Sequence, residues 1–182
     1  MDGGRLRVEP VGRDDAPLVH RLTQAAFAEF RGALDPPSGA DTETADEVAA
    51  AIDAGGAAVA WIGEEAVGAI RWTPLPGHLY VGRLAVLPAH RGQGVGLALV
   101  AFAETQAASL ELPEVRVEAR SALPENAAFF QGRGFVVVEE RLHPRSPAAT
   151  TVVLAKPVPT SGPGTTSFVV GIPGARTSRP RE

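Results

Sequence analysis

The chain has 182 residues, of which 45% are hydrophobic and 21% are charged, a composition typical of a globular protein with one sizeable core. Its net charge of −4 argues against a nucleic-acid-binding protein, and no apolar run is long enough to predict a membrane span. The absence of cysteine and the scattered positions of the four histidines exclude disulfides and thiolate metal sites and predict no metal centre.

In chain order, the first patterns predict a strand and two helices. Residues 1–10 lack the apolar core of a signal peptide, so we expect a cytoplasmic protein. The alternation of apolar and polar residues over 6–11 predicts a half-buried strand. Asp14 or Asp15 can cap a first helix. Thr44 and Glu47 form a capping box that opens a second helix.

The middle of the chain predicts more strands and two further helices. Gly63-Glu64-Glu65 separates two apolar runs and predicts a hairpin. The strands are expected at 57–62, 66–73, 78–87, 115–119, 136–143 and 150–156, and the helices at 94–110 and 126–133. This mixture of strands and helices predicts an α/β (α+β) domain over residues 1–156.

The last segment, 157–182, differs in composition from the rest of the chain. It is rich in Pro, Gly, Ser and Thr, and such a sequence buries too little apolar surface to offset the entropy lost on ordering. We therefore expect a disordered tail, in which only the apolar cluster from Phe168 to Ile172 is suited to docking.

A glycine-rich loop lies between the strand that ends at Leu87 and the helix at 94–110. Its sequence, Arg91-Gly92-Gln93-Gly94-Val95-Gly96, predicts a phosphate cradle, because glycines let backbone N–H groups approach an anion and a helix N-terminus supplies free donors. The loop lacks the Gly-Lys-Ser/Thr of a nucleotide P-loop. It also lacks the third glycine of a dinucleotide fingerprint, since position 99 is Leu.

The loop and a later segment resemble the GNAT superfamily of N-acetyltransferases. R-x-x-G-x-G after Leu84-Ala85-Val86-Leu87-Pro88 resembles the family's acetyl-CoA pyrophosphate loop, and residues 126–135 resemble its later Asn–aromatic–Gly-Phe motif. The resemblance implies a mixed, mostly antiparallel sheet of about six or seven strands with about four helices, splayed between the strands at 79–87 and 115–119.

The resemblance also implies acetyl-CoA as co-substrate, with no metal, and an amine on a small molecule or protein as acceptor. The acetyl group would pass by direct attack in a ternary complex, in a monomer or homodimer with no nucleic-acid or membrane partner. The implied cofactor-binding residues are Leu84, Ala85, Val86, Arg91, Gly92, Gln93, Gly94, Val95, Gly96, Asn126 and Phe129.

The catalytic residues are less clear from the motifs. Tyr80 lies where several family members place a catalytic Glu, and Glu118 is expected to face the same cleft; His78 is a third candidate base. The family's usual general acid is a Tyr at the position of Phe130. This difference keeps open an alternative function, a non-catalytic acyl-CoA-binding or sensing module.

Two arginines have open roles at this stage. Arg83 either binds an acidic group on the substrate or is solvated or salt-bridged. Arg133 either reaches a CoA phosphate or stabilises the end of its own helix.

Overall fold

A seven-stranded sheet forms the centre of the computed structural model, which describes residues 4–159. The strand order is β1-β2-β3-β4-β5-β7-β6, and all neighbours are antiparallel except β4 and β5. The strands are β1 (Leu6–Val11), β2 (Gly56–Ile62), β3 (Glu65–Leu75), β4 (His78–Val86), β5 (Glu114–Arg120), β6 (Val136–His143) and β7 (Ser146–Pro157). The predicted mixed, mostly antiparallel sheet is confirmed.

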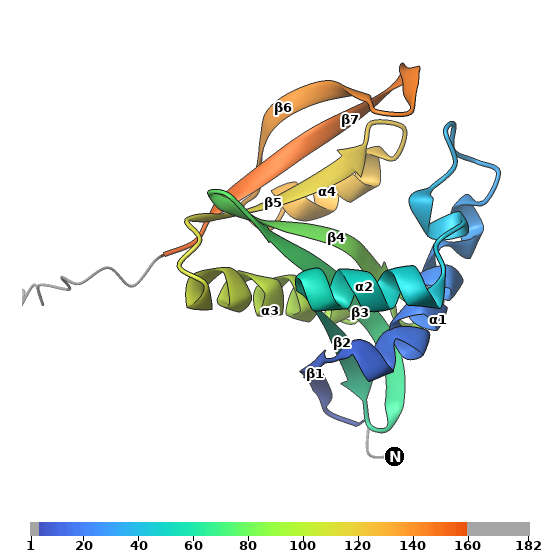
Figure 1. The fold of residues 1–182 in the computed structure, drawn as a ribbon, viewed down its shortest axis with the longest axis vertical. Helices are drawn as coiled ribbons and strands as arrows, with labels where there is room; N and C mark the ends of the chain where they lie inside the picture. The colour runs from blue at the N-terminus through green and yellow to red at the C-terminus, as the bar shows by residue number, and fades with distance from the viewer. Residues whose placement is uncertain (1–3, 160–182) are drawn as a thin grey trace, which may run out of the picture.

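Four α-helices cover the two faces of the sheet (Figure 1). They are α1 (Ala16–Phe27), α2 (Ala45–Ala54), α3 (Val95–Ser109) and α4 (Pro124–Gln131). Helices α1 and α2 pack on β2–β4, and α3 and α4 pack on the opposite face, where α4 covers β5, β7 and β6. Short 3₁₀ turns occur at Arg13–Asp15, Ala28–Phe30, Gly39–Asp41 and Pro88–His90.

The period of the side chains along β2 explains how one sheet supports both helical layers. Ala57 and Val59 pack against α1 and α2, whereas Ala58 and Ala60 belong to the core beneath α3. Successive residues of a strand point to opposite faces, so a continuous apolar run is what a strand buried on both faces requires.

Several local signals of the sequence act as expected. Thr44 and Glu47 form the predicted capping box: Thr44 N–H donates to Glu47 Oε2 (2.7 Å), and Glu47 N–H donates to Thr44 Oγ1 (3.2 Å). Gly134 has φ of +86° beyond the end of α4. The predicted Asp cap differs, because the Asp15 carboxylate accepts a hydrogen bond from Gly12 N–H (3.1 Å) and none from the amides of α1.

The folded chain continues beyond Lys156, where we expected the domain to end. β7 extends to Pro157, and Val158 is 9% exposed and packs on the core. Val158 N–H also donates to the carbonyl of Pro113 (2.8 Å). The predicted tail lies almost wholly outside the described residues, as does the cluster from Phe168 to Ile172.

No helix within residues 4–159 combines the length and the apolarity needed to cross a lipid bilayer.

Candidate active site

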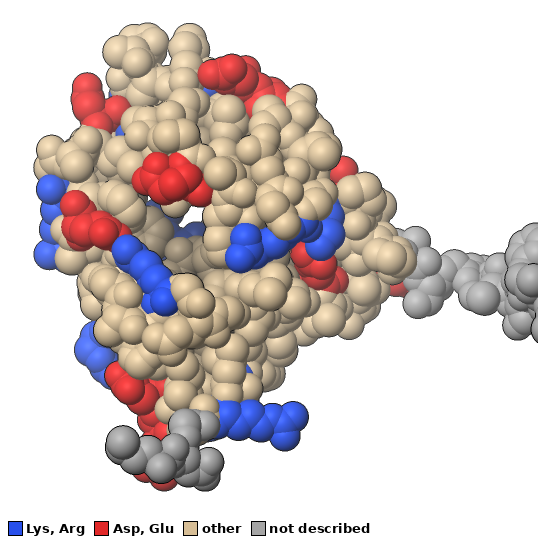
Figure 2. Space-filling view, turned by 180° about the vertical axis from the view of Figure 1, so that it is seen from behind, with Lys and Arg blue, Asp and Glu red and all other residues tan. Residues whose placement is uncertain are grey.

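The cleft of the molecule begins where β4 and β5 separate. These parallel strands pair at three positions only: Leu79 with Val115, Tyr80 with Arg116, and Val81 with Val117. Beyond Val81 the two strands diverge (Figure 1), and a cavity of about 1070 Å³ opens between them. The surface is hollowed near its centre, where basic and acidic side chains surround the opening (Figure 2). The predicted splay between these strands is confirmed.

A bulge in β4 shapes one wall of this cleft. Ala69 of β3 pairs with Ala85, but Arg71 pairs with Gly82, so β4 carries one extra residue between these positions. Arg83 at the bulge has φ of +51°, an unusual value for a residue other than glycine. The bulge interrupts the alternation of side chains between the two faces of β4, next to the point where β4 stops pairing with β5.

The structure places the three predicted β4 residues differently. Leu84 and Val86 line the cleft, whereas Ala85 is 1% exposed and does not line it. The β5-facing edge of this stretch has no partner strand, since the parallel pairing ends at Val81. Its backbone groups that point away from β3, apart from the Val86 carbonyl that accepts a hydrogen bond from Arg91, are therefore available to an extended ligand, which can pair with them as an added strand does.

The glycine-rich loop forms a backbone cradle at the start of α3. Gly92 and Gly94 have φ of +74° and +83°, and Gly94 is the N-cap of α3. The Ala98 N–H, which donates to Gly94 C=O (3.0 Å), makes the first helical hydrogen bond. The preceding amides of Val95, Gly96 and Leu97 thus have no helical acceptor and are available to an anion.

Two side chains of the cradle are engaged with the protein itself. The guanidinium of Arg91 donates to the carbonyls of Ala26 (3.1 Å) and Val86 (3.3 Å) and pairs with Glu29 (2.5 Å). Gln93 Nε2 donates to the carbonyl of Ala89 (3.0 Å). The anion-binding capacity of the loop therefore resides in its backbone amides, and Arg91 ties the loop to the end of α1.

Helix α4 supplies the aromatic side of the cleft. Asn126, Phe129, Phe130 and Arg133 all line the cavity. A Cβ added at Gly96 would lie 3.1 Å from Phe129 Cζ, so the glycine allows α3 and α4 to approach closely. The Arg133 guanidinium stacks on Phe129, with Cζ 3.4 Å from the ring centroid.

Phe130 is a packed ring at the position of the family's usual acid. It is 8% exposed and makes edge-to-face contacts with Phe129 and Phe135, with centroids 5.1 and 5.4 Å apart. Such a ring contributes apolar surface and no proton.

The predicted catalytic pair lies together in the cleft, and His78 lies outside it. Tyr80 and Glu118 both line the cavity, whereas His78 begins β4 at the paired end of the strand. Burial, followed by the nearby Glu118 carboxylate, raises the pKa of Tyr80, and Arg83 and Arg141 oppose the shift. Because the phenol stays protonated at neutral pH, Tyr80 can donate a proton but cannot serve as a base. Glu118 forms an ion pair with Arg141 of β6.

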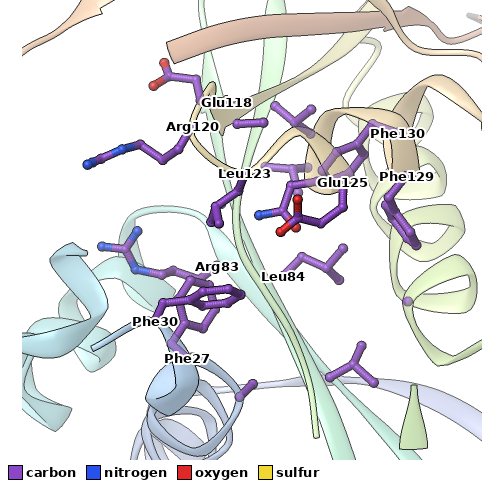
Figure 3. A pocket seen from close by; sticks show the side chains of 18 of the residues that line it. Phe27, Phe30, Arg83, Leu84, Glu118, Arg120, Leu123, Glu125, Phe129 and Phe130 are labelled. Atoms are coloured by element: carbon purple, nitrogen blue, oxygen red, sulfur yellow. The ribbon is translucent and has the colours of Figure 1, made fainter. Parts of the chain in front are cut away.

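The structure shows further polar residues in the cleft that the sequence motifs did not identify. They are Arg120, His143, Arg145 and Thr151. Arg83 and Arg120 lie on one side of the cleft, and Phe129 and Phe130 lie on the other (Figure 3). Arg83 is salt-bridged to Glu43 (Nε to Oε2, 3.6 Å). The four residues that the motifs missed come from β5, β6, the β6–β7 turn and β7. No local sequence motif could therefore have identified them together.

The comparisons with known proteins agree with this geometry. The model of the acetyltransferase (GNAT) family matches residues 19–135. That match spans more than half of the 182 residues, and the chain belongs to the GNAT acetyltransferase family. That family is one of acyl-CoA N-acyltransferases, which take the acetyl group from acetyl-CoA. No curated protein matches the chain.

Three solved structures illustrate the shared fold. An IAA acetyltransferase from Bacillus cereus is 19% identical, with a TM-score of 0.62 over 84% of this chain and 99% of that one. The ribosomal-protein-S18-alanine N-acetyltransferase from Escherichia coli is 14% identical, with a TM-score of 0.66 over 87% and 97%. A GNAT family acetyltransferase from Elizabethkingia anophelis with acetyl-CoA bound is 15% identical, with a TM-score of 0.64 over 86% and 99%.

The residues of the cleft fit acetyl-CoA. The amides at the start of α3 suit a pyrophosphate, and the unpaired edge of β4 suits the amide-bearing pantetheine arm. A Cβ added at Gly94 would meet no protein atom within 4 Å, so the cradle has open space above it. Bound acetyl-CoA supplies the acetyl group as a thioester, whose sulfur is the leaving group.

Proposed function

We propose that the chain transfers the acetyl group of acetyl-CoA to a primary amine of a small molecule or protein, by direct attack in a ternary complex. The observation that carries this proposal is one continuous cleft, which joins the amide cradle of α3 to the unpaired edge of β4 and to Tyr80 and Glu118. A new C–N bond forms at the acetyl carbonyl, and the C–S bond breaks with its electron pair left on sulfur. The nitrogen loses one proton, and the thiolate takes up one.

Tyr80 is our candidate for the proton donor to the thiolate. Its phenol is protonated at neutral pH, as an ordinary tyrosine is, and burial, followed by Glu118, raises its pKa further. It lines the same cleft as Phe130, whose ring has no proton to give. Tyr80 would therefore perform from β4 the task that a Tyr at position 130 would perform from α4.

Glu118 is our candidate for holding the amine. Its carboxylate lies on the cleft side of β5, within the electrostatic reach of Tyr80. An anion there attracts the ammonium form of the acceptor and takes, directly or through water, the proton that leaves before attack; the second proton, lost from nitrogen as the C–N bond forms, balances the one that the thiolate takes up. The ion pair with Arg141 fixes the carboxylate in place.

The test is the release of free CoA thiol from acetyl-CoA with a panel of primary amines. Tyr80→Phe should lower kcat by about 10²-fold, the lower end of what general acid catalysis supplies. Phe130→Tyr should restore part of that loss in the Tyr80→Phe background, because it returns a hydroxyl to the cleft. Phe102→Tyr, which adds a hydroxyl to a ring of α3 outside the cavity, is the matched control and should restore nothing.

One alternative function can be tested in the same assay. The ring at Phe130 favours a non-catalytic acyl-CoA-binding module, because it removes the family's usual acid. That alternative predicts calorimetric binding of CoA without thiol release for every amine and every variant, including Phe130→Tyr.

A further inference from the structure

The end of the cleft beyond Glu118 is lined by basic groups on a face of the sheet that no helix covers among the described residues. Arg120 of β5 pairs in register with Thr151 of β7, and both line the cavity with His143 and Arg145. Helices α1 and α2 pack on β2–β4, so among the described residues no helix covers this face of β5 and β7. The Arg120 side chain extends on the opposite side of the cleft from Phe129 (Figure 3).

The arginines at this end have no carboxylate partner among residues 4–159. Arg120 Nη2 donates to the carbonyl of Pro36 (2.6 Å), and Arg145 Nη2 donates to the carbonyl of Pro37 (2.7 Å). These acceptors are neutral, so they orient the guanidinium groups without compensating their charge. The pKa of Arg120 is lowered by burial and then by the nearby Arg145, with Asp35 opposing. Two cations are therefore held close together.

Thr151 presents a hydroxyl that the protein leaves unsatisfied. The residue is 3% exposed, it lines the cavity, and its Oγ1 has no hydrogen-bond partner among the described residues. A buried polar atom without a partner is uncommon and costs free energy. A ligand oxygen in the cleft would satisfy it.

His143 adds a neutral donor to the same group. Burial, then Arg120 and Arg145, lower its pKa, against a smaller effect of Glu118. Its Nδ1 accepts a hydrogen bond from Arg145 N–H (3.2 Å), so the neutral ring carries its proton on Nε2. All four side chains can thus donate a hydrogen bond, as an anion site requires.

We propose that the acceptor is a small amino acid whose carboxylate is bound by Arg120, Arg145 and the hydroxyl of Thr151. This proposal rests on the acetyl transfer proposed above. Glu118 and Arg120 are two residues apart on one face of β5, which places their Cα atoms about 6.6 Å apart. An α-amino acid carries its ammonium and carboxylate on one carbon, closer together than these two Cα atoms, so the Glu118 and Arg120 side chains must converge on it, with the amine at Glu118 and the carboxylate at Arg120.

The same contacts argue for a small acceptor over a polypeptide. The bonds from Arg120 to Pro36 and from Arg145 to Pro37 link the loop after α1 to β5 and to the β6–β7 hairpin. This bridge narrows the end of the cleft through which a peptide chain would have to continue.

The first test compares acceptors that differ only in the anionic group. Amino acids, their carboxamides and aminoalkyl phosphates are assayed for thiol release from acetyl-CoA. We expect kcat/KM to be at least about tenfold higher for the acids than for the carboxamides, since one charge-assisted hydrogen bond provides that much. Equal rates for acids and carboxamides would overturn the proposal, and a preference for the phosphates would overturn the choice of carboxylate.

The second test removes the proposed contacts one at a time. Arg120→Met and Thr151→Val should raise KM for the acids with little change in kcat, and neither should change KM for the carboxamides. Thr151→Val should not lower the melting temperature, because the lost hydroxyl has no partner. Arg21→Met, which removes an exposed charge of α1 outside the cavity, is the matched control and should leave all values unchanged.

A third measurement needs no turnover, so it separates this proposal from the acetyl transfer. Saturation-transfer NMR on the CoA-loaded protein compares N-acetyl amino acids with their N-acetyl amides. Signals from the acids alone, lost in Arg120→Met, would support the carboxylate site even if no amine is acetylated. Equal signals from acids and amides in the wild type would overturn the site even if acetyl transfer is observed.

Discussion

Tyr80 can be observed without interference, because it is the single tyrosine of the chain. An alkaline titration followed by tyrosinate absorbance therefore reports one group. We expect the folded protein to titrate above the ordinary tyrosine value of about 10, and the denatured protein to return to it. The cause is burial, followed by the Glu118 carboxylate.

Two variants give the sign of each charge effect on that titration. Glu118→Gln should lower the midpoint, because it removes a negative charge that disfavours tyrosinate, and Arg83→Gln should raise it. Glu114→Gln, on the same strand but paired with Arg116, is the control and should leave it unchanged. A wild-type midpoint below about 10 would contradict the burial of Tyr80 beside Glu118 that raises its pKa.

A buried ion pair beside the cleft makes a second residue-scale prediction. Arg71 Nη2 lies 2.8 Å from both Glu43 carboxylate oxygens, and the two side chains are 8% and 15% exposed. Glu43→Gln would leave the Arg71 charge buried without compensation, so we expect a loss of about 3 kcal/mol in the free energy of unfolding. Chemical denaturation measures this. Asp53→Asn, which breaks an exposed pair with Arg13, should cost less than about 1 kcal/mol.

Some residues of the site could be predicted from the sequence, and others could not. Gly92 and Gly94 could be predicted, because glycine adopts a positive φ most readily and the loop lies between a strand and a helix. Arg91 was expected to contact the phosphates, yet its side chain is occupied by Ala26 and Glu29. Thr151 and Arg120 meet only through the register of β5 and β7, which no pattern within either strand specifies.

At the scale of elements, the start of α3 gives the clearest test of the cradle. Gly94→Ala places a Cβ in open space but at φ of +83°, which costs roughly 1–2 kcal/mol for an L-residue. The loop should relax and move its amides, so we expect weaker CoA binding by calorimetry. Gly96→Val should weaken binding through a different contact, because a Cβ there would lie 3.1 Å from Phe129.

The control for both glycine variants is Gly12→Ala. Gly12 has φ of −104°, and an added Cβ would meet no atom within 4 Å, so stability and CoA affinity should not change. Unchanged CoA affinity in Gly94→Ala and Gly96→Val, with the fold intact, would show that the cofactor phosphates bind elsewhere.

The elements themselves were largely predictable, and their irregularities were not. The strands and helices follow from apolar periodicity and from caps such as that of Thr44. The bulge of β4 did not follow, because Arg83 is not a residue that signals a positive φ. It arises from the tertiary structure, where β4 keeps its pairing with β3 while it diverges from β5.

At the scale of the whole molecule, the parallel ladder of three residue pairs joins the two parts of the sheet. One core cluster crosses this junction, since Val81, Val117 and Leu154 all belong to it. The apolar packing beneath α3 and α4 can therefore hold β4 and β5 together at one end while their other ends stay apart. The cleft exists because β4 and β5 are hydrogen-bonded at one end and lie apart at the other.

The end of the folded domain provides the last prediction. We propose that the domain ends after Val158, two residues later than composition predicted. A chain that ends at Val158 should melt like the full protein, whereas one that ends at Lys156 should melt at a lower temperature. Val158 is buried and its N–H donates to Pro113, so losing it should cost about 2 kcal/mol, or about 5 °C in a chain of this size.

Differential scanning calorimetry of the two truncated chains measures that difference. Val158→Ala in the full chain is the control, because it removes apolar contact but keeps the hydrogen bond to Pro113, and its melting temperature should lie between those of the two truncations. If the chain ending at Val158 also melts several degrees below the full protein, the segment after it stabilises the domain. In that case the apolar cluster from Phe168 to Ile172 is the first place to substitute, since it holds the largest apolar side chains of that segment.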